Sequence, residues 1–191
     1  EDSSINTEEE IDAWKDVAAE AENAAEAKRK YLSLNSVNKG SQMLETLKKS
    51  YESASEDITS LTTALSESVS GTGLSTDSVD AVTSMFSDLK GYDEDKLLDK
   101  TANGLRLNTR ELEKLKKEYD DNTAKEFYND VEDAYNAWQT ALMNGEEQSV
   151  IDSLHDQYQQ AAQLADQYVG LTSAYNQWQN ALSTANEGDM Y

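Results

Sequence analysis

The chain has 191 residues and a formal net charge of −22, from 38 acidic and 16 basic side chains, and it contains no Cys, no Pro and one His. These figures exclude disulfide frameworks and thiol chemistry, and they leave too little histidine for most catalytic triads and zinc sites. A chain this negative repels phosphate backbones, and no run of 18 apolar residues is present, so we predict neither direct nucleic-acid binding nor a membrane segment.

The apolar content is low for a folded chain, so the spacing of the apolar residues decides the fold class. Leu, Ile, Val and Phe make up 33 residues, or 17%, and below about 20%, with a high net charge, disorder is the usual outcome. Apolar side chains nevertheless recur at helical spacing through most of the chain, and strand patterns are nearly absent. We therefore predict an all-α protein built of elongated helical hairpins in a coiled-coil-like bundle.

Glycines mark the expected helix ends, because the chain has no proline to break a helix. Glycine just past a helix end adopts the left-handed conformation without strain, which suits Gly40, Gly91, Gly104 and Gly145. We predict six helices, two or three of them long, at about residues 7–37, 42–70, 76–90, 94–103, 109–144 and 147–186. They form an N-terminal helical hairpin (1–70), short helices and connectors (71–108) and a long helical hairpin (109–191), and residues 105–107 are expected to be only a connector.

The first helix opens with a capping box made by Thr7 and Glu10. Its apolar positions recur every seven residues at Ile11, Ala18, Ala25 and Leu32, with Trp14 and Ala21 alongside. An alanine-rich seam buries little area per residue, so we expect this helix to be marginal unless a partner covers it.

The second helix has the most regular seam in the chain. Its apolar residues repeat every seven positions at Leu44, Tyr51, Ile58 and Leu65, and Leu47, Ala54 and Leu61 follow three residues after the first three. These are a and d positions over about four heptads, a pattern typical of helix-on-helix packing.

Polar residues begin the later helices. Ser75 or Thr76 starts the helix after the glycines at 71 and 73, and Asn108 with Glu111 forms a capping box before the helix at 109–144. The last helix has three adjoining apolar positions, a stripe wide enough for two neighbouring helices. They hold Leu154, Ala161, Tyr168, Tyr175 and Leu182; Ile151, Tyr158 and Ala165; and Leu164, Leu171, Trp178 and Ala185.

Residues 134–142 and 174–182 match at seven of nine positions and share the pattern Ala-Tyr-Asn-x-Trp-Gln-x-Ala-Leu. Core packing alone explains the Tyr and Trp residues, but a duplicated helical unit of about 40 residues also explains the matched Asn and Gln residues. Such a repeat predicts that residues 189–191 begin another helix and that the natural chain continues. The candidate packing or partner stripe comprises Tyr135, Trp138, Leu142, Tyr168, Tyr175, Trp178, Leu182, Leu44, Tyr51, Ile58 and Leu65.

Motifs that carry chemistry are missing from the sequence. Asp152, His155 and Asp156 approach one another on a helix, but no second His completes a metal site. The acidic run at 93–95 lacks the glycine and the terminal glutamate of a calcium loop, and residues 71–73 lack a phosphate-loop lysine. We therefore expect no catalytic residues, no metal and no cofactor.

The last third of the chain has an uneven charge. From Glu126 onward there are eleven acidic residues and no Lys or Arg. Its solvated face is therefore negative, which serves solubility, repels DNA or an acidic wall, or meets a basic partner.

Three groups of residues carry a resemblance to a known family. They are Gly73-Leu74-Ser75-Thr76 followed by Val82-Thr83-Ser84-Met85-Phe86; Thr101-Ala102-Asn103-Gly104-Leu105 followed by Leu107-Asn108-Thr109 and Glu111-Leu112; and the two Tyr-Asn-x-Trp-Gln units with Asn186-Glu187-Gly188-Asp189. Together these phrases, over about residues 60–191, resemble the tail tape-measure proteins of long-tailed phages and prophages.

The resemblance implies an internal helical fragment of a structural virion protein whose extended length sets the length of the tail. It would lie in the lumen of the tail tube, having been made in the bacterial cytoplasm, and leave ahead of the genome. Its partners would be the tube protein, the tail assembly chaperone and other copies of itself, with no direct nucleic-acid contact and no membrane contact in this segment.

The alternative is a helical interaction or spacer module of a bacterial surface or secreted protein, with the Tyr/Trp stripe as its contact surface. Neighbouring genes for tail tube and tail tip proteins would favour the tape measure. A signal peptide and a wall anchor in the full-length chain would favour the surface module.

Overall fold

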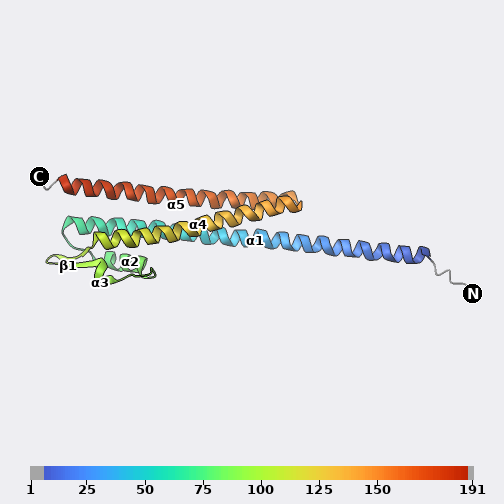
Figure 1. Cartoon of the computed structure of the whole chain (residues 1–191), viewed down its shortest axis with the longest axis horizontal. Coiled ribbons are helices and arrows are strands. Elements are labelled where there is room, and N and C mark those ends of the chain that lie inside the picture. The colour runs from blue at the N-terminus through green and yellow to red at the C-terminus, as the bar shows by residue number, and fades with distance from the viewer. Residues whose placement is uncertain (1–6, 189–191) are drawn as a thin grey trace, which may run out of the picture.

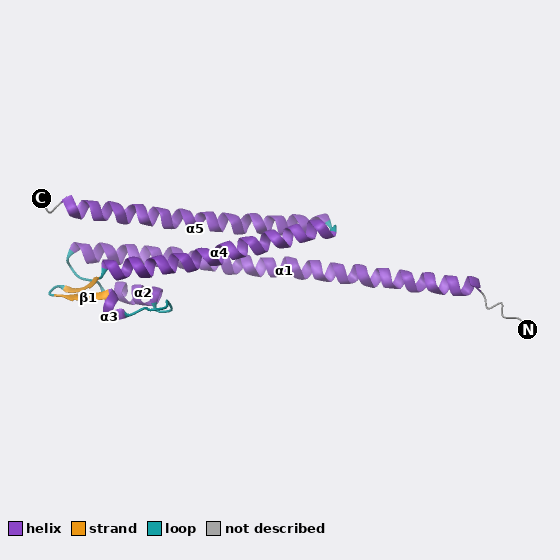
Figure 2. Ribbon diagram, viewed as in Figure 1, coloured by secondary structure: helices purple, strands orange, loops and turns teal. Residues whose placement is uncertain are grey.

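The computed structural model describes the backbone of residues 7–188 and the side chains of residues 14–182 and 184. In chain order the elements are α1 (Thr7–Ser70), α2 (Thr76–Phe86), α3 (Glu94–Leu97), β1 (Leu98–Thr101), β2 (Gly104–Leu107), α4 (Thr109–Asn144) and α5 (Gln148–Gly188). The described chain is all-α apart from one two-stranded antiparallel sheet (Figure 2). The Thr7–Glu10 capping box, the side chains of Ile11 and Ala185 and the helix expected at 189–191 lie outside the described residues.

The three long helices form an elongated bundle. α4 runs antiparallel to α1, and α5 turns back to run alongside both (Figure 1). The prediction that the last helix has two helical neighbours is therefore confirmed. α1 continues beyond the α4–α5 turn, so that its N-terminal part projects from the bundle (Figure 1). At 1.5 Å per residue its 64 residues span about 96 Å.

The predicted break at Gly40 is wrong, and with it the N-terminal hairpin within residues 1–70. α1 is one continuous helix from Thr7 to Ser70. Gly40 lies inside it because its missing side chain makes room for Gln157 of α5. A Cβ at Gly40 would lie 1.8 Å from Gln157 Oε1. The Gln157 side chain is 6% exposed, and its Nε2 donates to the Val37 carbonyl at 2.8 Å and to Ser41 Oγ at 3.2 Å. This glycine therefore permits a close helix–helix approach.

The helix predicted at 94–103 is wrong over most of its length, because only its first four residues are helical, in α3. The described chain has five helices where six were expected, since the first two predicted helices are the single helix α1. α3 ends at Leu97, and a hairpin follows in which Leu98 pairs with Leu107 and Thr101 with Gly104. The hairpin is held by chain outside it, because the Leu74 amide donates to the Leu105 carbonyl at 2.8 Å and the Leu107 amide donates to Ser68 Oγ at 3.0 Å. Residues 105–107 are thus a strand, and Gly104, with φ +117°, serves the hairpin turn instead of a helix end.

The short helix α2 ends at Phe86, four residues before its predicted end. Its last turn is closed by Leu89 N donating to the Phe86 carbonyl at 3.0 Å, and Tyr92 N then donates to the Leu89 carbonyl at 3.1 Å. The predicted caps are confirmed at three other ends: Ser75 accepts from Ser78 N, Asn108 accepts from Glu111 N, and Gly145 is left-handed at φ 64°.

Two buried apolar clusters lie along the bundle. One joins the C-terminal part of α1 to the start of α4, the end of α5 and the small α2–β2 region, with Phe86, Leu97 and Leu112 fully buried. The other joins the middle of α1 to α4 and α5 around Leu47, Phe127 and Tyr168. The seam predicted for residues 44–65 is confirmed: its members are buried except Tyr51, which is half-buried.

Candidate functional site

The first repeat unit places its aromatic side chains between α4 and α5. Trp138 stacks on Tyr158 with ring centroids 5.8 Å apart and an interplanar angle of 8°. His155 lies 4.6 Å from the Trp138 ring centroid, and Tyr135 meets Tyr158 edge to face at 5.4 Å. Among the described residues, no group of three His, Asp or Glu side chains could hold a metal ion, and His155 packs within this aromatic group. Its role is therefore helix packing at the turn end of the hairpin.

The second repeat unit packs against the opposite end of α4. Tyr175 is buried, and Trp178 lies 5.9 Å from it, half-buried at the edge of the same apolar cluster. The ammonium of Lys116 sits 4.7 Å above the Tyr175 ring, a cation–π contact. The Tyr175 hydroxyl is buried without a hydrogen-bond partner among the described residues.

A layer of polar side chains separates the two apolar clusters. We call it the polar layer, and it comprises Asp57 of α1, Lys116, Tyr119 and Asp120 of α4, and Tyr168 and Tyr175 of α5. Lys116, 5% exposed, donates to both oxygens of Asp120 at 2.5 Å. Tyr119 donates to Asp57 at 2.6 Å and Tyr168 donates to Asp120 at 3.3 Å. The three helices are thus joined by hydrogen bonds at one level.

Burial raises the pKa of all three tyrosines of the polar layer well above the usual value of 10.0. For Tyr119 the hydrogen bond to Asp57 adds to burial in raising the pKa, and for Tyr168 and Tyr175 the negative charge of Asp120 does so. Loss of solvent and a nearby carboxylate both disfavour a phenolate. The three phenols therefore stay protonated, and those of Tyr119 and Tyr168 donate hydrogen bonds within the polar layer.

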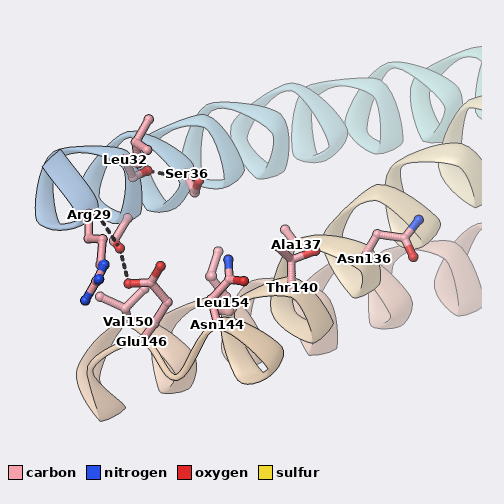
Figure 3. Close-up of a pocket in the computed structure, with 12 residues that line it drawn as sticks. Arg29, Leu32, Ser36, Asn136, Ala137, Thr140, Asn144, Glu146, Val150 and Leu154 are labelled. Carbon is pink, nitrogen blue, oxygen red and sulfur yellow. Dashed lines mark hydrogen bonds between the residues drawn. The ribbon is translucent and has the colours of Figure 1, made fainter. Parts of the chain in front are cut away.

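A groove lies where α1 separates from the α4–α5 turn. Figure 3 shows Arg29 and Ser36 on α1 and, across the groove, Thr140 and Asn144 on α4. Its volume is about 700 Å³, and the remaining lining side chains are Ser33, Asn136, Ala137, Ala141, Glu146, Val150 and Leu154. Ser33 donates a hydrogen bond to the Glu146 carboxylate, which ties α1 to the turn. The lining mixes small, apolar and polar side chains.

The residues of the predicted packing or partner stripe fall into two sets. Leu44, Ile58, Leu65, Tyr168 and Tyr175 are buried in the bundle, and Tyr51, Trp138, Trp178 and Leu182 are half-buried against it. Only Tyr135 and Leu142 are exposed enough to meet a partner directly.

Sequence reasoning missed the polar layer and the Gly40–Gln157 contact. Lys116 follows Leu112 by four residues and therefore shares its helix face, a signal that could have marked it as buried. Gln157 carries no comparable signal, because its partner is 117 positions away in the sequence.

Comparisons with known proteins return no match to a family model, to a curated protein or to a solved structure. Among the described residues, no helix combines the length and the apolar character that crossing a membrane requires.

Proposed function

We propose that this chain is a structural segment of a tail tape-measure protein, in which helix length is the functional quantity. The proposal is supported by one observation above others, the uninterrupted 64-residue helix α1. A helix converts residue number into length at a constant 1.5 Å per residue, so a rod of this kind can measure distance.

The charge of the chain supports the same role. The net charge is −22, and every charged side chain from residue 126 onward is acidic. A surface of this sign repels DNA phosphates, so a genome passing through the same tube would not be retained by the protein. The tube protein, the tail assembly chaperone and other copies of the chain are the partners that this role requires, and the tail lumen is its location.

The experiment changes the length of α1 without changing the bundle. Residues 13–30 lie outside the two buried apolar clusters and span 18 residues, which is five complete turns, so duplicating them preserves the phase of the helix. In the phage that encodes the chain, one, two and three extra copies should lengthen the tail by about 27, 54 and 81 Å. Electron microscopy of purified particles measures the change.

The matched control replaces side chains within the same segment and keeps its length, as in Ala19→Glu. Tails of unchanged length in the duplication series, or a chain absent from the tails altogether, would refute the proposal.

The exposed apolar side chains near the N-terminus of α1 favour a second candidate, a helical spacer or interaction module of a bacterial surface or secreted protein. Trp14, Val17 and Tyr31 are each more than half exposed, as expected of a contact surface. Antibodies against the chain separate the two candidates, because they would label intact cells for a surface module and particle tails for a tape measure.

A further inference from the structure

We call residues 7–32 of α1 the arm. The N-terminal part of α1 projects beyond the α4–α5 turn (Figure 1), and Glu22, Glu26, Arg29 and Lys30 line a groove together with the turn residues 144–147. Every side chain described from residue 14 to residue 32 is exposed, including Trp14 at 70%, Tyr31 at 70% and Leu32 at 50%. A single helix carrying such side chains gains little from burial and is marginal alone, so the arm is expected to need a covering partner.

The α4–α5 hairpin of the same chain packs on a different side of α1 from the apolar seam of the arm, so it cannot be that partner. Ser33, Val37 and Gly40 mark the line on α1 that meets the hairpin. At about 100° per residue, the arm seam of Ala18, Ala21, Ala25 and Leu32 lies roughly 100° around the helix from that line. The hairpin-facing line continues into the arm as polar side chains, among them Asp16, Asn23 and Glu26. An apolar partner must therefore approach from another direction.

We propose that this partner is the arm of a second copy of the chain, packed antiparallel. The charge distribution along the arm favours antiparallel over parallel packing. Residues 8–20 hold six acidic side chains and one Lys, whereas residues 28–30 are Lys-Arg-Lys. A parallel pair in register would place the two acidic runs side by side and the two basic runs side by side. An antiparallel pair sets the basic run of each copy against the acidic run of the other, with Lys30 level with Asp16.

Most apolar side chains of the seam match in the same orientation; the exception is Ala18, which lies level with Lys28 of the other copy. With the two-fold axis at the level of Asn23, Trp14 of each copy lies over Leu32 of the other, and Ala21 lies over Ala25. Large side chains then meet at both ends of the contact, and small ones meet in the middle, where they allow close approach of the helices. The overlap of residues 14–32 is about 28 Å long. The interface is self-complementary, so it closes as a dimer and leaves the two bundles at opposite ends.

This pairing goes beyond the proposed function and does not depend on it, since a surface spacer would pair in the same way. Sedimentation velocity over about 10 µM to 1 mM, the range of a weak dimer, should show the mass rising from 21.2 kDa toward twice that value. Ala21→Glu places a charge in the seam and should weaken the dimer by at least about tenfold. Ala19→Glu, on the polar side of the same turn, is the matched control and should leave the dimer intact.

Disulfide trapping tests the orientation, because the chain has no native Cys. Mixing the Ala21→Cys and Ala25→Cys variants under mild oxidation should give the mixed disulfide, and each variant alone should give little. A chain that stays monomeric over the whole range, equal effects of Ala21→Glu and Ala19→Glu, or disulfides formed by each variant alone would overturn the proposal. All three substituted positions lie outside the buried clusters, so circular dichroism should show the same helix content in every variant.

Discussion

Gly40→Ala should destabilise the protein, although the same change in most helices is stabilising. Alanine is favoured over glycine inside a helix by about 1 kcal/mol. At this position the new methyl group would lie 1.8 Å from Gln157 Oε1, so the Gln157 amide must leave its place. It would lose its bonds to the Val37 carbonyl and to Ser41 Oγ, both within the bundle.

The expected magnitude follows from these two opposing effects. Loss of the partners of a buried amide costs about 1–3 kcal/mol, and the helix propensity gained returns about 1 kcal/mol. Gly40→Ala should therefore lower the free energy of unfolding by about 1 kcal/mol, equivalent to about 2–4 °C in Tm for a chain of this size. In a Gln157→Ala background the obstruction is gone, and Gly40→Ala should then raise the free energy of unfolding by about 1 kcal/mol.

Urea unfolding followed by helical circular dichroism, for the four chains of this double-mutant cycle, measures the effect. Gly170→Ala is the matched control, because Gly170 lies in α5 with no atom within 4 Å of the position of a Cβ. It should stabilise both backgrounds by about 1 kcal/mol. If Gly40→Ala stabilised the wild-type chain as Gly170→Ala does, the close-approach explanation of Gly40 would be wrong.

Three further predictions concern the bundle and its connections. The three polar-layer tyrosines have raised pKa values, so their contribution to stability should be complete below pH 10 and lost above it, by about 1 kcal/mol per tyrosine between pH 10 and 11; a phenolate absorbance titration should show them ionising only as the helical signal is lost, not near pH 10 in the intact fold. Lys116→Met should lower the free energy of unfolding by about 1–3 kcal/mol because it leaves Asp120 without its cation, and adding Asp120→Leu should restore most of that loss in urea unfolding. Gly73→Ala should cost about 1–2 kcal/mol more than Gly145→Ala in thermal unfolding, since both glycines have positive φ but only at Gly73 would the Cβ meet backbone, 2.5 Å from the Asn103 carbonyl oxygen; equal losses would contradict this reasoning.

The long helices could be predicted from sequence because their seams repeat over many residues. The heptads from Leu44 to Leu65 fix one face of α1, and the wide stripe of α5 requires two neighbours, which the fold supplies. Gly40 could not be interpreted in this way, because a helix-ending glycine and a glycine that admits another side chain look the same in one sequence. The difference lies in Gln157, which reaches α1 only after the chain has turned twice.

The hairpin at 98–107 was missed because its stabilising partners are distant. Four-residue strands carry too little periodicity to be recognised, and the register depends on Ser68 and Leu74, which bond to β2 from outside it. A signal was present in the Asn103–Gly104 pair, a dipeptide common in tight hairpin turns. It was interpreted as a helix end because the preceding residues favour a helical start.

Lys116 shows why charge patterns alone do not locate a polar layer. Lys114, Lys116 and Lys117 lie within four positions, and the first and third of them are exposed. Only Lys116 falls on the face that α5 covers, where Asp120 and the Tyr175 ring compensate its charge. The helical face, rather than the residue type, decides which lysine is buried.

The two repeat units share a sequence pattern but have different surroundings in the α4–α5 hairpin. In the first unit Trp138 packs on Tyr158 near the turn, whereas in the second Trp178 packs at the edge of the cluster around Leu112. The matched asparagines nevertheless both line a groove, since Asn136 lines the groove beside α1 and Asn176 lines a smaller groove beside Lys116. A half-buried Trp and an asparagine that lines a groove therefore recur at an offset of 40 residues. Such recurrence is expected of a duplicated unit that keeps its own helical faces while its neighbours change.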